Sequence, residues 1–437
     1  MEPVKLGLLG LGTVGSGTVN MFHRAGAEIE RRAGRQIIVT RAAARDLSKP
    51  RDCETRDIDL TDDPMSIIND PDIQVIVELI GGYEEARDLV LAAIRQGKHV
   101  ITANKAMIAK YGNEIFAEAE KHGVTVAFEA AVAGGIPIVK AIRESLVGNH
   151  IQWLAGIVNG TTNYILTQMR DEGWGFQTAL DEAQRLGYAE ADPTFDVEGI
   201  DAAHKLTILA SIAFGVPLQF DKVYTEGIAG IGREDIQYAE ELGYSIKHLA
   251  IAQMTDEGIE LRVHPTLVPH RRLMANVGGV MNAVMVYGDA VGRTMYYGAG
   301  AGSEPTASAV MGDILDVVRS LSAGPDNRVP YLGFQLASLS SVPVLPMEAI
   351  ETAYYLRMEV LDSPGVMAAV TQILAELNIS IEALLQKVPE PDQNTVPIIM
   401  LTHRIRERQM NEALYRIGQL EAVQGKIVRI RLEYFDE

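Results

Sequence analysis

Cysteine and tryptophan are scarce in this sequence of 437 residues, and basic residues are fewer than acidic ones. There is one cysteine, Cys53, with two tryptophans, 39 lysine and arginine residues, and 58 aspartate and glutamate residues. A single cysteine excludes an intrachain disulfide framework and any metal site built from several cysteines, and it suits a reducing compartment such as the cytoplasm. The formal net charge of −19 repels polyanions, so we expect no nucleic-acid partner.

Long apolar runs are also absent. A membrane-spanning helix needs roughly 20 apolar residues, and the longest candidate segment, 206–218, is interrupted by Gly215 and Pro217. The N-terminus has the acidic Glu2 and then a glycine-rich stretch, which is not the pattern of a signal peptide. We therefore expect a cytoplasmic protein with no membrane partner. The apolar content of 47% is ample for packed cores, and the length predicts roughly three domains.

A glycine-rich segment near the N-terminus is the first positive signal. Residues 4–10 are almost continuously apolar and predict a buried strand, and residues 18–27 predict a helix. Between them lies Gly-x-Gly-x-x-Gly, formed by Gly10, Gly12 and Gly15. In this context the glycines permit a tight turn, a close approach of backbone N–H groups to a pyrophosphate, and close packing of the helix. The pattern predicts a dinucleotide at a helix N-terminus; the alternative is a glycine-rich turn of another α/β protein.

The end of the next expected strand, residues 36–44, bears on the choice of dinucleotide. In NAD-selective proteins an acidic residue at this position binds the ribose 2′-hydroxyl. Here Arg45 and Asp46 follow the strand, with Lys49 and Arg51 soon after. Arg45, together with Lys49, suits a 2′-phosphate, so NADP(H) is favoured, while Asp46 keeps NAD(H) open. The alternative is a solvated basic loop.

Strand and helix patterns continue to alternate along the N-terminal third of the chain. Strands are expected at 73–79, 98–102 and 124–128, and helices at 84–96 and 111–122. This order predicts a doubly wound parallel sheet over residues 1–135. Ligands bind beyond the carboxyl ends of the strands in such sheets, so the segments 102–105 and 129–135 are candidate site segments.

The polar signals of the middle of the chain centre on one expected helix, at 197–214. Asp201 and Lys205 are four residues apart and therefore share a face, and the ordinary interpretation is an exposed ion pair. However, apolar residues occur all round this helix, which predicts that it is buried. Burial lowers the pKa of a lysine and a nearby carboxylate raises it, a balance that can suit proton exchange in catalysis. From the helix alone, a structural and a catalytic role stay open.

Other polar residues precede and accompany this pair. Glu190 and Asp196, with Asp201 and Lys205, form a set that could bind a zwitterion, because carboxylates suit an ammonium group and a lysine suits an oxygen. His204 points elsewhere on the same helix, so we expect a core histidine. Upstream, residues 157–163 predict a strand that ends in a turn, with Thr161 or Thr162 as the cap of the next helix.

At these motifs the sequence resembles the homoserine dehydrogenase family over essentially the whole chain. The resemblance is carried by Gly-Leu-Gly-Thr-Val-Gly-Ser-Gly at 10–17, Thr-Ala-Asn-Lys-Ala at 102–106, Glu-Ala-Ala-Val-Ala-Gly-Gly at 129–135, Asn-Gly-Thr-Thr-Asn at 159–163, Gly-Tyr-Ala-Glu-Ala-Asp-Pro at 187–193, and Gly-Ile-Asp-Ala-Ala-His-Lys at 199–205. The glycine motif alone is weak evidence. The Gly-Tyr-x-Glu-x-Asp-Pro segment followed by Asp-x-x-x-Lys is highly specific.

The resemblance implies reversible hydride transfer between L-aspartate 4-semialdehyde and L-homoserine with NADPH or NADH, a step in threonine, methionine and isoleucine synthesis. It implies that Lys205 donates a proton to the forming alkoxide, and that Lys105, at the nicotinamide edge, can share this task. Glu190 and Asp201 would bind the ammonium and hydroxyl ends of the substrate, with Asp196 in support.

Further ligand contacts are implied in the same way. Gly187 would approach both substrate and cofactor, Thr13 and Val14 would line the pyrophosphate turn, and Gly302 would lie near the cofactor where the chain returns to the nucleotide domain. A monovalent cation of the sodium type would stabilise the domain junction without taking part in the chemistry. Its ligands would be the Glu129 carboxylate and the backbone carbonyls of Val132, Gly134 and Ile136.

The last part of the chain has a different pattern. After the proline-rich linker at 342–346, the element order is βαββαβ, which predicts a ferredoxin-like fold. This part resembles an ACT domain, a small amino-acid-sensing module, which implies threonine as a feedback inhibitor. The alternative is a dimerisation module without a ligand.

The expected fold is therefore α/β with three parts. These are an NAD(P)-binding domain of the doubly wound, Rossmann type at 1–135, completed by about 303–340, an α+β catalytic and dimerisation domain at 136–302, and an ACT domain at 350–437. We expect a homo-oligomer, a dimer or a tetramer. Two other functions stay open, a different lysine-dependent amino- or hydroxy-acid dehydrogenase and a non-catalytic NADP(H)-binding amino-acid sensor. A sensor needs no buried proton donor, so Lys205, Asp201 and Glu190 together argue against it.

Overall fold

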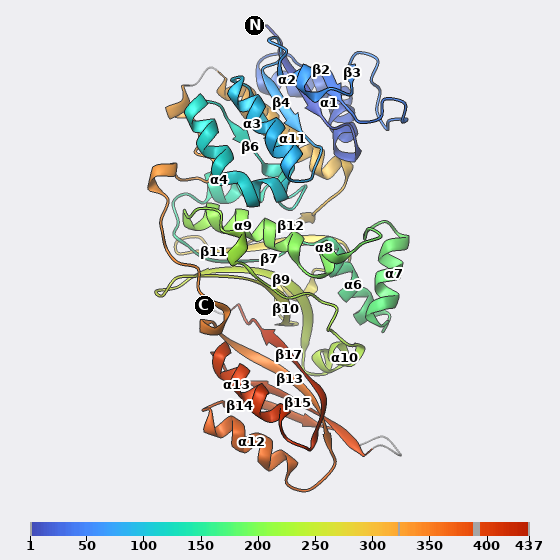
Figure 1. The fold of residues 1–437 in the computed structure, drawn as a ribbon, viewed down its shortest axis with the longest axis vertical. Coiled ribbons are helices and arrows are strands. Elements are labelled where there is room, and N and C mark those ends of the chain that lie inside the picture. Colours follow the sequence, from blue (N-terminus) through green and yellow to red (C-terminus); the bar gives the residue numbers. More distant parts are fainter. Residues whose placement is uncertain (1, 322–323, 388–393, 436–437) are drawn as a thin grey trace.

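The computed structural model describes residues 2–321, 324–387 and 394–435. Three parts follow one another along the long axis of the molecule (Figure 1). The N-terminal part contains strands β1–β6, the middle part strands β7–β12, and the C-terminal part strands β13–β17. None of the helices in these described ranges is long and apolar enough to cross a membrane.

The N-terminal part is a parallel sheet with the strand order β3-β2-β1-β4-β5-β6. Its strands are β1 (Val4–Leu9), β2 (Ile37–Ala43), β3 (Asp59–Thr61), β4 (Val75–Glu78), β5 (His99–Thr102) and β6 (Val126–Ala127). Its helices are α1 (Thr13–Ala33), α2 (Pro64–Ile68), α3 (Glu84–Arg95), α4 (Lys105–His122) and, from far along the chain, α11 (Ser303–Ser320). Apolar side chains of α1 and α11 pack on one face of the sheet, and those of α2, α3 and α4 pack on the other. The expected doubly wound arrangement is confirmed.

Two helices of this part begin earlier than the apolar pattern predicts. Helix α1 begins at Thr13, inside the glycine motif, rather than at residue 18. Helix α4 begins at Lys105 rather than at residue 111, because the side chain of Asn104 accepts the backbone N–H of Met107 and so caps the helix. As a result, the glycine loop lies at the N-terminus of α1, and Lys105 lies at the N-terminus of α4.

The middle part is built on antiparallel strands in the order β12-β11-β7-β9-β10. These strands are β7 (Ile151–Ile157), β9 (Tyr244–Met254), β10 (Ile259–Pro269), β11 (Met281–Gly288) and β12 (Gly292–Ala299), and the short β8 (Tyr224–Thr225) pairs with β10. The helices are α5 (Ile138–Lys140), α6 (Gly160–Asp171), α7 (Phe176–Arg185), α8 (Thr194–Val197), α9 (Ile200–Phe214) and α10 (Arg233–Glu241). Helix α9 contacts both α4 and β9, and therefore lies between the N-terminal part and the middle sheet (Figure 1).

Two expectations about these helices are wrong. The single helix expected at 197–214 is divided into α8 and α9, because Gly199 adopts a left-handed conformation with a φ of 83°. The cap of α6 is Asn159, whose side chain accepts the N–H of Thr162, rather than Thr161 or Thr162 itself. Both differences place additional polar groups next to the start of α9.

The C-terminal part has the expected βαββαβ order. Its elements are β13 (Glu351–Leu361), α12 (Val366–Glu376), β14 (Ile381–Gln386), β15 (Thr395–Thr402), α13 (Glu407–Gly418) and β17 (Val423–Leu432), with the additional short strand β16 (Ile405–Arg406) paired with β13. The sheet order is β17-β13-β15-β14.

This sheet is continuous with that of the middle part, which the sequence did not indicate. Strand β17 pairs in parallel with β10, with Arg431 opposite Thr266. The buried guanidinium of Arg431 contacts Glu407 of its own part at 2.5 Å and Glu226 of the middle part at 2.7 Å. Apolar side chains from both parts share one core cluster. The C-terminal part is therefore packed firmly onto the middle part.

Candidate active site

The loop between β1 and α1 has the geometry of a phosphate-binding turn. Gly10 has a φ of 102°, and a Cβ there would lie 2.7 Å from a backbone carbonyl oxygen just beyond β4. A Cβ at Gly15 would collide with the carbonyl oxygen of Gly10, so side chains are excluded at both positions. Gly12 precedes α1 without a side-chain cap, which leaves the N–H groups of the first turn, at Thr13 and Val14, available to an anion.

A cavity of about 390 Å³ opens beside this loop, at the carboxyl ends of β1, β2 and β4. Its lining includes Gly10 and Gly12 of the loop, and its charged residues are the basic Arg45, Lys49 and Arg51 and the acidic Asp46, Asp62 and Glu85. Arg45 forms an exposed ion pair with Glu85 at 2.8 Å, and Arg51 donates a hydrogen bond to the carbonyl of Leu11 at 3.3 Å. The cavity thus combines a glycine loop with basic side chains, a combination that suits a nucleotide carrying several phosphates.

The start of α11 closes one side of the glycine loop. Gly302, with a φ of 121°, precedes α11, and the Ser303 hydroxyl donates to the carbonyl of Thr13 at 2.8 Å. The structure therefore brings Gly302 next to the loop, although most of the N-terminal part and the whole middle part separate the two segments in sequence.

Two lysines share one buried carboxylate at the junction of the N-terminal and middle parts. The Nζ of Lys205 lies 2.6 Å from Oδ2 of Asp201, and the Nζ of Lys105 lies 3.1 Å from Oδ1 of the same group. Lys205 also donates to the carbonyl of Val158 at 2.6 Å. All residues of α9 after Ile200 are buried, so the interpretation of an exposed ion pair is wrong.

These contacts move the pKa values of the two lysines in opposite directions. Burial lowers the pKa of Lys205 below its usual value, although the attraction of Asp201 opposes this. The attraction of Asp201 raises the pKa of Lys105 despite burial. Burial disfavours ionisation of Asp201, but both lysines outweigh it and hold the pKa of that carboxyl well below its usual range. Lys205 is therefore the lysine that gives up its proton more readily.

A second carboxylate reaches this cluster through Asn159. The Nδ2 of Asn159 donates to Oδ1 of Asp196 at 2.7 Å and to Oδ2 of Asp201 at 2.9 Å. Burial, together with the charge of Asp201, raises the pKa of Asp196. Asn159 is not among the site residues predicted from the sequence, because the Asn-Gly-Thr-Thr-Asn segment indicates only a strand end and a helix cap and otherwise serves as one motif of the family resemblance.

A buried network at the ends of β4 and β5 positions Lys105. The carboxylate of Glu78 accepts the hydroxyl of Thr102 at 2.5 Å and the N–H of Ile80 at 2.8 Å. Asn104, which caps α4, donates to the carbonyl of Gly82 at 2.9 Å. The segment 102–105 thus anchors the loop after β4 and begins the helix that carries Lys105. Glu78 was also missed, since a single acid at a strand end gives little signal in sequence.

Gly187 and Glu190 lie on the loop between α7 and α8, outside the buried cluster. Gly187 has a φ of 76°, and the hydroxyl of Thr161 donates to the carbonyl of the neighbouring Tyr188 at 2.7 Å. The Glu190 side chain is exposed, and its charge contributes to the raised pKa of Lys105. The loop therefore faces the lysine cluster without direct contact with Asp201.

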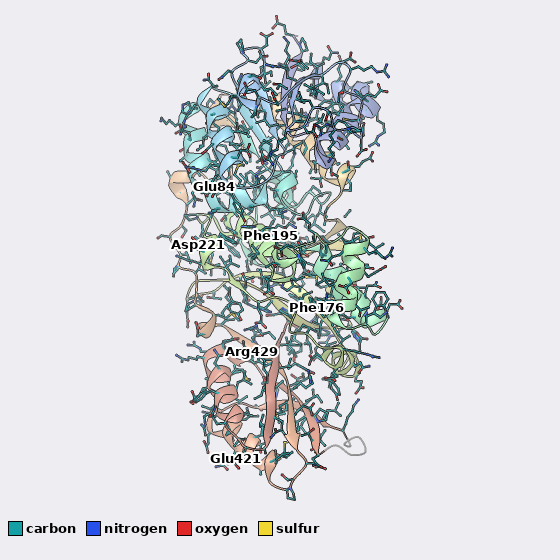
Figure 2. All side chains as sticks on the ribbon, turned by 45° about the vertical axis from the view of Figure 1, so that its right-hand side comes forward. Glu84, Phe176, Phe195, Asp221, Glu421 and Arg429 are labelled. Atoms are coloured by element: carbon teal, nitrogen blue, oxygen red, sulfur yellow. The ribbon has the colours of Figure 1, made fainter. Side chains whose placement is uncertain are left out.

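Aromatic side chains border the cluster. Figure 2 shows Phe195 at the junction of the N-terminal and middle parts. Its ring lies 5.9 Å from the Nζ of Lys105 and 5.4 Å from the ring of His204. His204 is fully buried and stacks on Phe220 at 4.3 Å, and burial lowers its pKa to about 4. Its placement agrees with a neutral core histidine.

The proposed cation ligands lie on the segment that leads into α5. Glu129 is buried, and its carboxylate oxygens accept the N–H groups of Val139 at 3.0 Å and Lys140 at 2.8 Å. Burial raises the pKa of Glu129 to about 7. Within the described ranges, no donor contacts the carbonyl oxygens of Val132 or Gly134, while the carbonyl of Ile136 accepts the N–H of Ile138 at 2.8 Å. A buried carboxylate and free carbonyls are a donor set that fits a hard cation.

Comparisons with known proteins agree with this geometry. The family model described as "Homoserine dehydrogenase, NAD binding domain" matches residues 10–129, that described as "Homoserine dehydrogenase" matches residues 137–315, and an ACT domain model matches residues 354–422. A homoserine dehydrogenase of Pseudomonas aeruginosa is 60% identical over 99% of both chains.

Solved structures give the same result. The crystal structure of a homoserine dehydrogenase from Thiobacillus denitrificans matches with a TM-score of 0.94 at 60% identity over 99% of both chains. A hyperthermophilic archaeal homoserine dehydrogenase in complex with NADPH matches with a TM-score of 0.60 at 25% identity, covering 72% of this chain and 98% of that one. The chain therefore belongs to the homoserine dehydrogenase family and is an NAD(P)-dependent oxidoreductase with a C-terminal ACT domain.

Proposed function

We propose that Lys205, Lys105 and Asp201 perform the proton transfer of the homoserine dehydrogenase reaction, the reversible reduction of L-aspartate 4-semialdehyde to L-homoserine. When bound, the nicotinamide cofactor supplies or accepts the hydride. The observation that carries the proposal is the single buried carboxylate shared by two lysines with oppositely shifted pKa values. Lys205, with the lowered pKa, protonates the forming alkoxide. Lys105 keeps its charge and stabilises the developing negative oxygen.

The carboxylates around the lysines divide between the two ends of the substrate. Glu190 lies on an exposed loop and forms no ion pair with any of the described residues, so we assign it to the ammonium group, with Gly187 beside it. Both oxygens of Asp201 contact lysines, so Asp201 acts on the hydroxyl end through these lysines. Asp196 supports this end through Asn159.

A cofactor oxidation assay tests the reaction. With L-aspartate 4-semialdehyde, the absorbance of NADPH is expected to fall, and with L-homoserine and NADP it is expected to rise. Turnover of other amino or hydroxy aldehydes alone would favour a different lysine-dependent dehydrogenase. A folded protein that binds NADPH without any turnover would favour an amino-acid sensor instead.

We further propose NADP(H) as the preferred cofactor, with NAD(H) as the alternative. The pyrophosphate would bind at the glycine loop of residues 10–15, and Gly302 would approach it from α11. Arg45 lines the cavity at the end of β2, where the 2′-position of the adenine ribose would lie. The related archaeal enzyme in complex with NADPH supports this choice.

Replacing Arg45 by alanine is expected to weaken NADPH binding by about 10- to 100-fold, the scale of a lost charged hydrogen bond. NADH binding should change little, because NADH has no 2′-phosphate. Fluorescence titration of each cofactor measures both affinities. Arg56→Ala, at an exposed ion pair with Glu54, is the matched control. Equal weakening of NADH and NADPH would contradict a role in 2′-phosphate recognition.

A monovalent cation of the sodium type is proposed at Glu129, with carbonyl ligands from Val132, Gly134 and Ile136. The backbone N–H of Gly135, in the same segment, donates to the carbonyl of Ala299 at 3.0 Å. A cation here would neutralise the buried carboxylate and stabilise the connection between the N-terminal and middle parts.

The division into domains at 1–135 with 303–340, 136–302 and 350–437 is proposed from the strand and helix pattern. We also propose a homo-oligomer, a dimer or a tetramer. A cytoplasmic location suits a chain whose one cysteine, Cys53, is free.

Threonine is the proposed feedback inhibitor, bound by the C-terminal part. Strand β17 pairs with β10, so a change in the C-terminal part would reach the middle sheet directly. In the full-length chain, added L-threonine is expected to lower the rate progressively and to raise the unfolding temperature, because a ligand of the folded state stabilises it. D-Threonine is the control. Unchanged rate and unfolding temperature would exclude threonine as an effector.

A further inference from the structure

Asn159 occupies a position from which one side chain contacts three parts of the site. It lies buried in the turn between β7 and α6. Its Oδ1 accepts the N–H of Thr162 at 2.8 Å. Because a backbone N–H can only donate, this bond fixes which end of the amide faces α6 and which end faces the site.

The other end of the amide faces two carboxylates. Its Nδ2 donates to Oδ1 of Asp196 at 2.7 Å and to Oδ2 of Asp201 at 2.9 Å. Each of the two hydrogens of the NH₂ group has one carboxylate oxygen as its acceptor, so the group has no further hydrogen to donate. Each bond favours the ionised form of its carboxylate, and Asn159 lowers the pKa of both groups against the effect of burial.

The same contact sets the rotation of the Asp201 carboxylate. Oδ2 of Asp201 accepts hydrogen bonds from Asn159 and from Lys205, while Oδ1 contacts the Nζ of Lys105. The backbone carbonyl of Val158, the residue before Asn159, accepts a hydrogen bond from Lys205. Residues 158 and 159 thus hold the amine of Lys205 and the carboxylate that balances it in one fixed arrangement.

We propose that Asn159 is a positioning residue of the reaction, which acts through Asp201 and Asp196 by donating one hydrogen bond to each. Its hydrogen bonds favour the ionised form of the two neighbouring carboxylates and orient Asp201 between the lysines. This inference rests on the proposed role of Lys205 as the group that exchanges the proton.

Asn159→Asp tests the inference, because it preserves the shape and the Oδ1 acceptor that caps α6 but replaces the NH₂ donor by an oxygen and so adds a third carboxylate to the site. We expect kcat to fall by about 10²-fold, the scale on which misplacement of a catalytic group acts, with little change in the KM for the cofactor. In homoserine oxidation, which needs neutral Lys205, the ascending limb of the pH profile should move to higher pH. An added negative charge raises the pKa of a lysine, by about one unit or more at this range.

Asn159→Ser provides a second test, since serine also caps a helix but is too short to bridge both carboxylates. It should lower kcat without the upward shift of the lysine limb that the added charge produces. Equal unfolding temperatures for the variants and the wild type would exclude loss of the cap as the cause.

The outcomes distinguish a failure of the proposed role of Asn159 from a failure of the proposed role of Lys205. If Lys205→Ala loses turnover while folded Asn159→Asp keeps the wild-type kcat and pH profile, Asn159 has no positioning role and the role of Lys205 stands. If Lys205→Ala keeps turnover, the proposed role of Lys205 fails, and the inference about Asn159 fails with it. A shifted limb and a reduced kcat in Asn159→Asp, with Lys205→Ala inactive, support both.

Discussion

Replacing Lys205 by alanine is expected to lower turnover by about 10²- to 10⁴-fold, the usual contribution of a positioned acid–base group. The affinity for NADPH should change little, because Lys205 lies on α9 and the cofactor cavity lies at the glycine loop of the N-terminal part. Steady-state NADPH oxidation measures turnover, and fluorescence titration measures cofactor binding.

Two further variants make this test specific. Lys205→Arg retains a positive charge, but an arginine does not release its proton at accessible pH, so it should also lose most turnover. Lys222→Ala removes an exposed lysine just beyond α9 and should behave like the wild type. Similar turnover in Lys205→Ala and the wild type would remove this residue from the mechanism.

Asp201→Ala is expected to destabilise the protein by about 3–5 kcal/mol, because it leaves two lysines without their shared partner at a largely buried site. Turnover should also fall, since the pKa values of both lysines depend on this carboxylate. Urea unfolding at neutral pH measures the free energy. Asp181→Ala, at an exposed position of α7, is the control and should change stability little.

The pH dependence of this effect has a definite sign. The pKa of Asp201 is depressed in the folded state, so its contribution to stability is present above its unfolded pKa of about 3.9. That contribution is lost as the pH falls through the acidic range. The difference in free energy of unfolding between wild type and Asp201→Ala should therefore shrink progressively below about pH 5. A difference that stays constant down to pH 3 would contradict an ionised Asp201 in the folded protein.

Parts of the site could be predicted because they depend on short-range patterns. The glycine spacing at 10–15 predicts a phosphate loop, since only glycine fits where a Cβ would meet backbone. The apolar residues all round 200–214 predict a buried Lys205, and the structure buries it. The family resemblance implies a role for Lys105. The sequence gives no sign that Lys105 and Lys205 contact the same carboxylate, that of Asp201.

Other features depend on contacts between distant segments. Asn159 bridges Asp196 and Asp201 only because the turn after β7 packs against the break at Gly199. The pairing of β17 with β10 joins the C-terminal part to the middle sheet, although the βαββαβ pattern is complete without it. A strand pattern with a period of two residues specifies which face is buried and leaves open which strand lies alongside.

Side-chain periodicity and backbone sterics act over a few residues, so the sequence alone predicts the alternating elements of the N-terminal part, the βαββαβ order of the C-terminal part, the glycine loop and the burial of α9. Three contacts between distant segments are seen only in the folded chain: Asp201 pairs with two lysines, Asn159 bonds to two carboxylates, and Arg431 pairs with both Glu407 and Glu226. Those contacts arise where the chain path brings charged groups together in a buried place. Their protonation then depends on all the neighbours present there, which no local pattern contains.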